Sequence, residues 1–128
     1  MTTAATFQLP LSFRRIHLEL AREPDHPDGS GAIGYELLAP LLPDCRIDPD
    51  EWRKNREACR VVRIRPGQEH EIGHLVRRPG GSWAFRYVGT ADEAGYHFGE
   101  ERFVPGEYVS VREGDAQHTF KVITAQRL

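Results

Sequence analysis

Short runs in which apolar and polar residues alternate recur along most of the chain, and turn-forming residues separate them. The side chains of a strand point alternately to two faces, so each run predicts a strand with one buried side. Such runs occupy residues 13–22, 32–41, 60–65, 71–88, 96–98, 102–104, 107–112 and 118–124. In the first two runs the apolar side comprises Ile16, Leu18, Leu20, Ile33, Tyr35 and Leu37.

Residues 71–88 give the clearest hairpin, because two runs rich in β-branched and aromatic residues flank the turn-forming segment 79–82. Folding the chain at its Gly-Gly pair sets Val76 opposite Phe85 and His74 opposite Tyr87. The side chains expected on the apolar face are Ile72, Val76, Trp83, Phe85 and Tyr87. Those expected on the opposite face are Leu75, Arg77, Ala84 and Arg86.

A second hairpin is predicted near the end of the chain, where residues 107–112 and 118–124 flank the turn-forming segment Glu113-Gly114-Asp115. Its inward side chains are expected to be Val109, Val111, Phe120 and Val122. Residues 23–31 and 89–95 contain glycines and turn-forming residues, and we expect loops there.

One helix is predicted, beginning near residue 49 and ending near residue 59. Asp48 suits the N-cap position and Pro49 suits the first turn. Ile47 and Trp52 occupy the two positions of a hydrophobic staple, so we expect the Trp52 side of the helix to pack on the sheet.

The sum is a mainly β protein of about seven or eight short strands with one short α-helix. Turn signals at short spacing favour a closed or partly open antiparallel β-barrel, or a two-layer sandwich. Closure is preferred because an open sheet leaves edges that aggregate. We expect residues 1–11 to form a flexible N-terminal arm and residues 12–128 to form a single β-rich domain.

Composition and charge narrow the function classes. The chain has 128 residues, of which 39% are hydrophobic and 28% charged, which is ordinary for one globular domain. A net charge of -2 gives no basic excess to neutralise phosphates, so no nucleic-acid partner is expected. Without a signal peptide or a long apolar run, and with Cys45 and Cys59 expected as free thiols, we predict a soluble cytoplasmic protein with no membrane partner.

The segment His70-Glu71-Ile72-Gly73-His74 matches the His-Glu-x-x-His motif and in these five residues resembles the zincin metalloproteases. In that family the motif lies on a helix. The resemblance implies zinc as cofactor, His70 and His74 as metal ligands, and Glu71 as the catalytic base.

The local context favours a strand over a helix at this motif. Turn-forming Pro66-Gly67 lies just before it, and residues 79–81 follow soon after. A strand rises about 3.3 Å per residue, so His70 and His74 would lie about 13 Å apart and could not share a metal ion. We therefore expect residues 70–78 to be extended, with no metal and no catalytic residue.

The strand interpretation suggests a different site. His74 would lie beside Tyr87 on the apolar face, and His118 would begin the last strand on the Phe120 face. If these side chains converge inside a barrel, they line a pocket with polar tips. The candidate ligand-binding residues are Tyr35, His74, Trp83, Tyr87 and His118. The simpler interpretation is that the histidines are hydrogen-bonded core residues.

Three arginines, Arg77, Arg78 and Arg86, cluster near the tip of the central hairpin. They could grip an anionic ligand, but a solvated face paired with nearby carboxylates is the simpler interpretation.

Residues 71–87, 103–111 and 118–122 resemble segments of small uncharacterised proteobacterial proteins that have no assigned activity. The similarity covers most of the chain. The resemblance implies a bacterial origin and carries over no catalytic residue.

The sequence leaves three functions open. The first is a β-barrel-like binding module for a small ligand or a protein partner. The second is a zinc-dependent hydrolase that uses the motif at residues 70–74. The third is a structural or interaction protein that associates through a strand edge, for example as a homo-oligomer.

Overall fold

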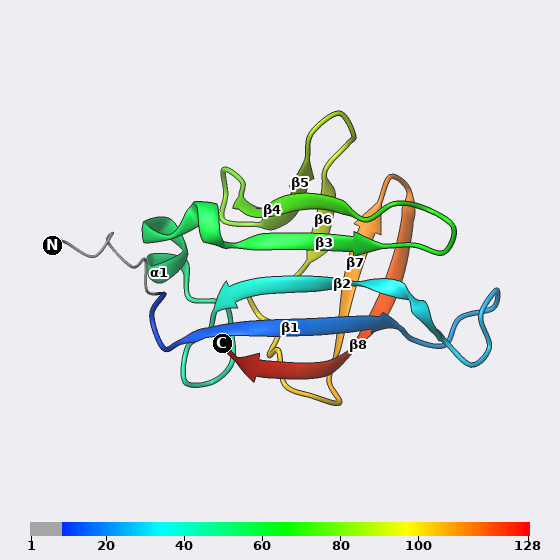
Figure 1. The fold of residues 1–128 in the computed structure, drawn as a ribbon, viewed down its shortest axis with the longest axis horizontal. Helices are drawn as coiled ribbons and strands as arrows, with labels where there is room; N and C mark the ends of the chain where they lie inside the picture. Colours follow the sequence, from blue (N-terminus) through cyan, green and yellow to red (C-terminus); the bar gives the residue numbers. More distant parts are fainter. Residues whose placement is uncertain (1–8) are drawn as a thin grey trace, which may run out of the picture.

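Eight antiparallel strands close into a single barrel in the computed structural model, which describes residues 9–128 (Figure 1). The strands are β1 (Phe13–Leu20), β2 (Ser30–Pro40), β3 (Arg60–Ile64), β4 (Glu71–Arg77), β5 (Trp83–Tyr87), β6 (Glu93–Tyr96), β7 (Tyr108–Glu113) and β8 (Ala116–Arg127). Each strand pairs with the next in the chain, and β8 pairs with β1 to complete the ring. The predicted mainly β fold is confirmed, as a closed barrel and not a sandwich.

The two ends of the barrel differ. One end, called the mouth here, is formed by loops 21–29, 65–70, 88–92 and 114–115, which lie at the right and the top of Figure 1. The other, the helix end, carries α1 (Pro49–Lys54) and the short 3-10 helix η1 (Arg56–Ala58). No helix in the described part of the chain is long and apolar enough to span a bilayer. Most of the predicted N-terminal arm, residues 1–8, lies outside the described residues.

Inward side chains fill the barrel with one continuous core, because alternate residues of every strand point inside. The predicted inward positions of β1, β7 and β8 are confirmed. They are Ile16, Leu18, Leu20, Val109, Val111, Phe120 and Val122, and all are buried.

The central hairpin pairs one residue out of the predicted register. Leu75 lies opposite Phe85, and His74 lies opposite Arg86. The reason is a five-residue connection, in which the Arg78 N–H donates to the Ser82 carbonyl at 2.7 Å. A slip of one residue turns every side chain of a strand to the other face. Accordingly, Leu75 is 1% exposed and Ile72 is 61% exposed, the reverse of the prediction.

The helix begins as predicted but is shorter. The Asp48 carboxylate accepts hydrogen bonds from the N–H groups of Asp50 and Glu51, which fixes the start. Asn55 leaves helical geometry, with φ −134° and ψ 35°, so α1 ends at Lys54 and a 3-10 turn follows.

Trp52 of α1 closes the helix end of the barrel. Its ring packs edge-on against Trp83, with ring centroids 5.1 Å apart. Its Nε1–H donates to the Leu75 carbonyl at 2.8 Å, so the one polar group of the buried indole has a hydrogen-bond partner. The predicted packing of this side of the helix on the sheet is therefore confirmed.

The sequence pattern failed between residues 89 and 104, where it predicted two short strands at the wrong positions. The predicted loop at 89–95 contains the start of β6, whereas residues 97–98 and 102–104 form no strand. The inward residues of β6 are Glu93 and Gly95, so the strand has no apolar alternation. The ring of Phe98 lies where a side chain of Gly95 would be, and it fills the core in place of one.

Replacement of Gly34 tests the close approach of β1 and β2. A Cβ at Gly34 would overlap the backbone carbonyl of Leu18. We expect Gly34→Ala to lower the free energy of unfolding by about 2 kcal/mol or more, measured by urea denaturation. Gly31→Ala in the same strand is the control, because its Cβ would lie 3.5 Å from the flexible end of Glu19. Equal effects of the two substitutions would contradict this account.

Candidate functional site

The five predicted ligand-binding residues do not line one pocket. Tyr35, Trp83 and Tyr87 are buried inside the barrel. His74 lies on the outer wall, with Nε2 3.9 Å from a carboxylate oxygen of Glu57, because of the shifted hairpin register. His118 is half-buried near the mouth and bonds Glu23 of the β1–β2 loop at 2.8 Å.

Aromatic rings fill the space in which a ligand would have to sit. Tyr35 packs against Phe85 and Phe120, with ring centroids 5.0 and 5.1 Å apart. Phe98 continues this cluster at 5.6 Å from Phe85 and 5.3 Å from Phe103. An eight-stranded barrel is just wide enough for its own side chains to fill it, and this one is filled. A ligand must therefore bind at an end of the barrel or on its outer wall.

A buried carboxylate organises the mouth. The Glu93 side chain is 4% exposed and accepts a hydrogen bond from the Tyr87 hydroxyl at 2.6 Å. The Arg63 Nε–H donates to its other oxygen at 3.2 Å, and an Nη2 of Arg65 lies 4.0 Å from that oxygen. Arg65 also donates to the Tyr35 hydroxyl at 3.1 Å. A buried charge persists only when paired in this way.

The network joins strands from opposite sides of the barrel. Arg63 of β3 pairs across the ladder with Tyr35 of β2, and its guanidinium also donates to Glu113 of β7 at 2.9 Å. Glu93 was missed by the sequence interpretation because it falls in a predicted loop. The available signal was the adjacent carboxylates Asp92 and Glu93 shortly after an apolar strand, a pattern too common in loops to single out.

The environment keeps both tyrosine hydroxyls protonated. Burial, followed by the hydrogen bond to Glu93, raises the pKa of Tyr87 above its ordinary value of 10.0. Burial and then the Glu93 charge raise the pKa of Tyr35 in the same direction. Both phenols therefore remain protonated at neutral pH, and the Tyr87 hydroxyl can donate its hydrogen bond to Glu93.

A cavity of about 150 Å³ lies beside this network at the mouth, lined among others by Arg63, Glu71, Asp92 and Glu113. Most of its charged groups already have partners. Arg63 is held by two carboxylates, and Asp92 bonds two arginines. The cavity is small and most of its charges are satisfied, so we interpret it as part of the barrel's closure.

The His-Glu-x-x-His segment is extended, as predicted. His70 precedes β4 in a loop, Glu71 lines the mouth cavity, and His74 lies on the outer wall. Helical spacing, on which the zincin mechanism depends, is therefore absent here. Within residues 9–128 no three His, Cys, Asp or Glu side chains are grouped closely enough to hold a metal ion.

The arginines near the hairpin tip have local partners. Arg78 and Arg86 lie 3.4 and 3.1 Å from Asp92, and the hydrogen bond from Arg86 is the main cause of the lowered pKa of that carboxyl. Arg77 lies over the Trp83 ring at 5.6 Å. The pairing with carboxylates predicted for this cluster is confirmed for two of its three members.

The two cysteines are free thiols. Burial raises the pKa of Cys59 to about 12, so this thiol is inert.

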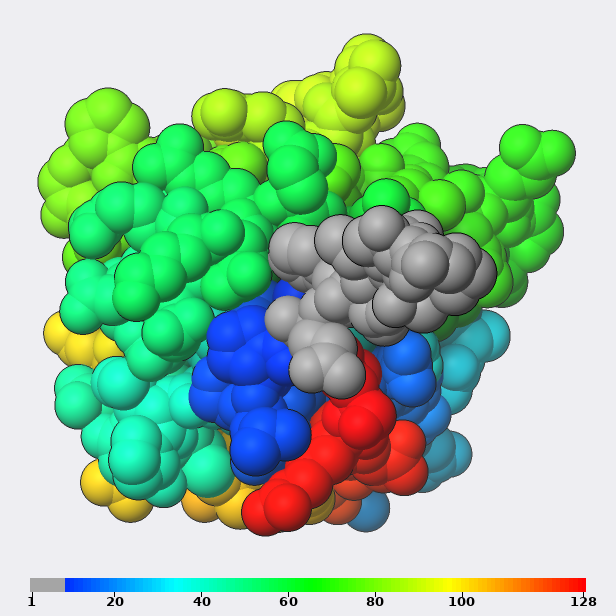
Figure 2. Space-filling model, turned by 60° about the vertical axis from the view of Figure 1, so that its left-hand side comes forward, coloured from blue at the N-terminus to red at the C-terminus, as the bar shows by residue number. Residues whose placement is uncertain are grey.

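A hollow of about 790 Å³ lies outside the barrel at the helix end, the end of the molecule that Figure 2 brings forward. It lies where the helical segment meets the outer wall of β2 and β3. Its lining comprises Leu9, Leu38, Arg53, Lys54, Asn55, Arg56, Glu57, Ala58 and Arg60. A neighbouring hollow of about 510 Å³ shares Arg56 and extends to the hairpin tip.

We call these two neighbouring hollows, which share Arg56, the basic groove. Among the described residues that line it, six are basic and one is a carboxylate. The basic residues are Arg53, Lys54, Arg56, Arg60, Arg77 and Arg78, and the carboxylate is Glu57. The sequence separates these residues into the basic side chains of the helical segment and those of the hairpin tip. Only the fold places them along one surface.

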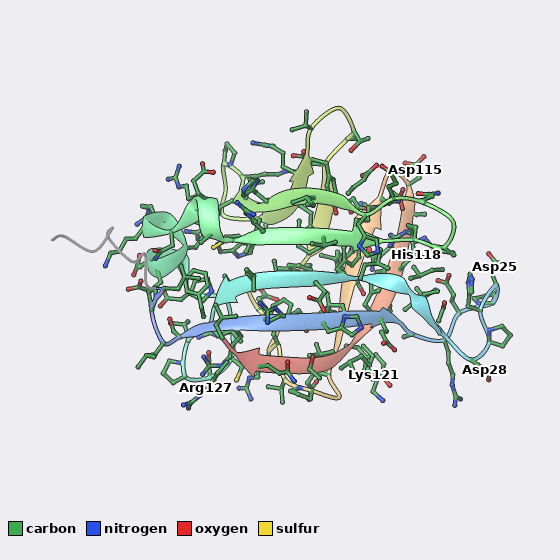
Figure 3. The ribbon with its side chains drawn as sticks, in the orientation of Figure 1. Asp25, Asp28, Asp115, His118, Lys121 and Arg127 are labelled. Carbon is green, nitrogen blue, oxygen red and sulfur yellow. The ribbon has the colours of Figure 1, made fainter. Side chains whose placement is uncertain are left out.

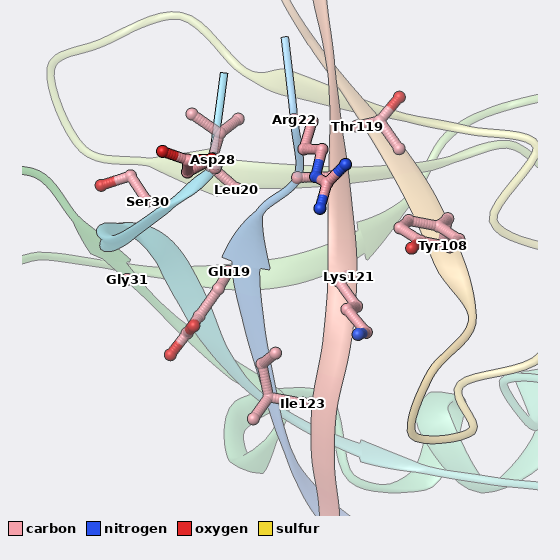
Figure 4. A pocket seen from close by; sticks show the side chains of 12 residues that line it. Glu19, Leu20, Arg22, Asp28, Ser30, Gly31, Tyr108, Thr119, Lys121 and Ile123 are labelled. Atoms are coloured by element: carbon pink, nitrogen blue, oxygen red, sulfur yellow. The ribbon is translucent and has the colours of Figure 1, made fainter. Parts of the chain in front are cut away.

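A third hollow, of about 670 Å³, lies on the outer wall of β1 and β8, where the register between β1 and β2 shifts after Glu19 (Figure 4). Arg22 and Lys121 lie on one side of it, and Glu19 and Asp28 lie on the other (Figure 4). Its charges are balanced, so it has no preference for one sign of ligand.

No family model, curated protein or solved structure matches this chain. The basic groove is therefore the candidate functional site on physical grounds alone, because it combines a large hollow with an excess of basic side chains.

Removal of the Glu93 charge tests the network at the mouth. We expect Glu93→Gln to lower the free energy of unfolding by about 3 kcal/mol, because it leaves two nearly buried guanidinium groups short of a counter-charge. Glu113→Gln, at a carboxylate that is 49% exposed, should cost less than about 1 kcal/mol. Urea denaturation of both variants measures this, and a larger effect of Glu113→Gln would refute it.

The raised pKa of Tyr87 predicts a pH dependence. Below the unfolded-state pKa near 10 the buried hydroxyl contributes its full stabilisation. At higher pH the unfolded phenol ionises first, so the advantage of the native protein over Tyr87→Phe should shrink by about 1.4 kcal/mol per pH unit. Denaturation at about pH 8 and about pH 11 measures the difference. A difference that stays constant would show that the hydroxyl is not protected.

Proposed function

We propose that this chain is a non-catalytic binding module, in which a rigid, filled barrel presents the basic groove to an anionic partner. One observation carries the proposal. The groove gathers six basic side chains in a chain whose net charge is -2. Charges of one sign concentrated in a hollow focus the field there and attract partners of the other sign.

Arg78 of the groove pairs with Asp92 at 3.4 Å, but other cations of the groove are only weakly engaged by the chain's own carboxylates. Arg53 and Lys54 lie 3.4 and 3.7 Å from Asp50 and Glu51 of the same helix, in exposed pairs of the kind that contributes little. For Arg60, no ion pair forms within the part of the chain that the structure describes. These side chains can therefore bind a partner without breaking a strong interaction.

Two of the arginines are held in place by aromatic rings. The guanidinium of Arg56 lies over Trp52 at 4.9 Å, and that of Arg77 lies over Trp83 at 5.6 Å. Stacking leaves the edge of a guanidinium free to donate hydrogen bonds to a carboxylate or phosphate. A pre-positioned donor loses less entropy on binding, which favours recognition over a purely solvent-facing role.

Association through a strand edge has less support. All eight strands have a partner on each side, and a closed ring offers no long unpaired edge to a second chain. The hydrolase alternative lacks a grouped set of metal ligands within residues 9–128.

A fluorescein-labelled peptide of ten glutamates tests the proposal by fluorescence anisotropy. We expect it to bind in low salt, and we expect Lys54→Glu with Arg60→Glu to weaken binding at least about tenfold, because each reversal replaces attraction by repulsion. Arg112→Glu with Lys121→Glu is the matched control, since it changes net charge equally on the outer wall of β7 and β8. Equal weakening by both pairs, or no binding, would rule out the groove as the site.

A further inference from the structure

We infer that the partner of the basic groove is an acidic peptide segment that inserts one apolar side chain between the basic residues. The inference rests on the proposed function and adds the chemical class of the partner. It is carried by a contrast in the lining of the groove. We call its apolar residues the floor and its charged residues the rim.

The floor comprises Leu9, Leu38 and Ala58, which are less exposed than the charged residues of the same lining. Leu9 and Ala58 pack against the core yet are only partly buried, and Leu38 is half-buried on the outward side of β2. These three come from the chain before β1, from β2 and from η1, so the apolar floor exists only in the folded chain. The free energy of binding becomes more favourable when an apolar group of a partner displaces water from such apolar surface.

The rim fixes the chemistry on either side of that apolar contact. Arg53 and Lys54 project from α1, and Arg60 begins β3. Guanidinium groups bind carboxylates with two parallel hydrogen bonds, so side chains of Asp or Glu suit these positions. A segment with an apolar residue flanked by carboxylates matches both the floor and the rim.

Nucleic acid fits this surface less well than a peptide. Proteins that bind single strands stack the bases on accessible aromatic rings. Here the two indoles of the groove region, Trp52 and Trp83, are buried and lie under Arg56 and Arg77. The net charge of -2 also opposes a polyphosphate that extends beyond the groove.

A second copy of this chain is a weaker candidate. Its carboxylates Asp25, Asp28 and Asp115 lie at the mouth, opposite the helix end (Figure 3). Contact between the mouth of one copy and the groove of another would be head-to-tail and would build a ring or a filament of many copies. A separate peptide can fill the groove without such assembly, so we prefer it to a second copy of the chain.

Two peptides that differ at one residue test the inference. Each has a central residue flanked by four glutamates on either side, with leucine in one and serine in the other. We expect the leucine peptide to bind the wild-type chain about tenfold more tightly at physiological salt, because burial of one leucine favours binding by roughly that factor. Competition against the labelled ten-glutamate peptide measures both affinities.

Substitutions in the floor make the test specific. Leu38→Ser should abolish the preference for leucine, measured as the ratio of the affinities for the leucine and serine peptides. Ile123→Ser, in the third hollow on the outer wall of β1 and β8, is the matched control and should leave the preference for leucine intact. Circular dichroism confirms that both variants are folded.

The outcomes separate the two proposals. Loss of all binding to ten glutamates would overturn the proposed function itself. Retained binding without a leucine preference, or a preference unchanged by Leu38→Ser, would overturn only the inference about the partner. Tighter binding of a ten-residue thymidine oligonucleotide, or concentration-dependent assembly of the chain in sedimentation velocity, would also overturn it.

Discussion

Closure of the eight-stranded ring is the constraint on which the rest of this structure depends. When β8 pairs with β1, the backbone hydrogen bonds of the wall are satisfied and the interior volume is fixed. The inward side chains must then fill that volume, and they do so with a cluster of aromatic rings. A filled interior moves any recognition to the ends and the outer wall.

The core of the barrel is covered by an aromatic side chain at one end and by a charged network at the other. At the helix end, the Trp52 indole covers the core and donates its one polar hydrogen to the backbone of β4. At the mouth, the inward positions hold charged residues, and the Glu93 carboxylate is tied to Tyr87 and Arg63. Such a network ties strands together across the opening, provided that every buried group in it is satisfied.

The excess of basic charge is local to one surface. Basic side chains of α1, η1 and the hairpin tip line the groove, although the same helical segment also carries the carboxylates Asp50, Glu51 and Glu57. Asp25, Asp28 and Asp115 lie at the opposite end, at the mouth (Figure 3). The field of the basic side chains is therefore strongest inside the groove and is screened within about 10 Å of it.

By itself, the sequence determined the strand pattern, the start of the helix at Asp48 and the extended backbone at residues 71–77, because alternation, capping and turn residues act over a few neighbours. It did not determine the hairpin register. One extra residue in the turn exchanged the inner and outer faces of β4 and moved His74 outside. It also missed β6, whose inward positions are Glu93 and Gly95. Only the tertiary structure decided which side chains meet, because Glu93 and Arg63, or Leu38 and Ala58, are brought together by ring closure and not by their spacing in the chain.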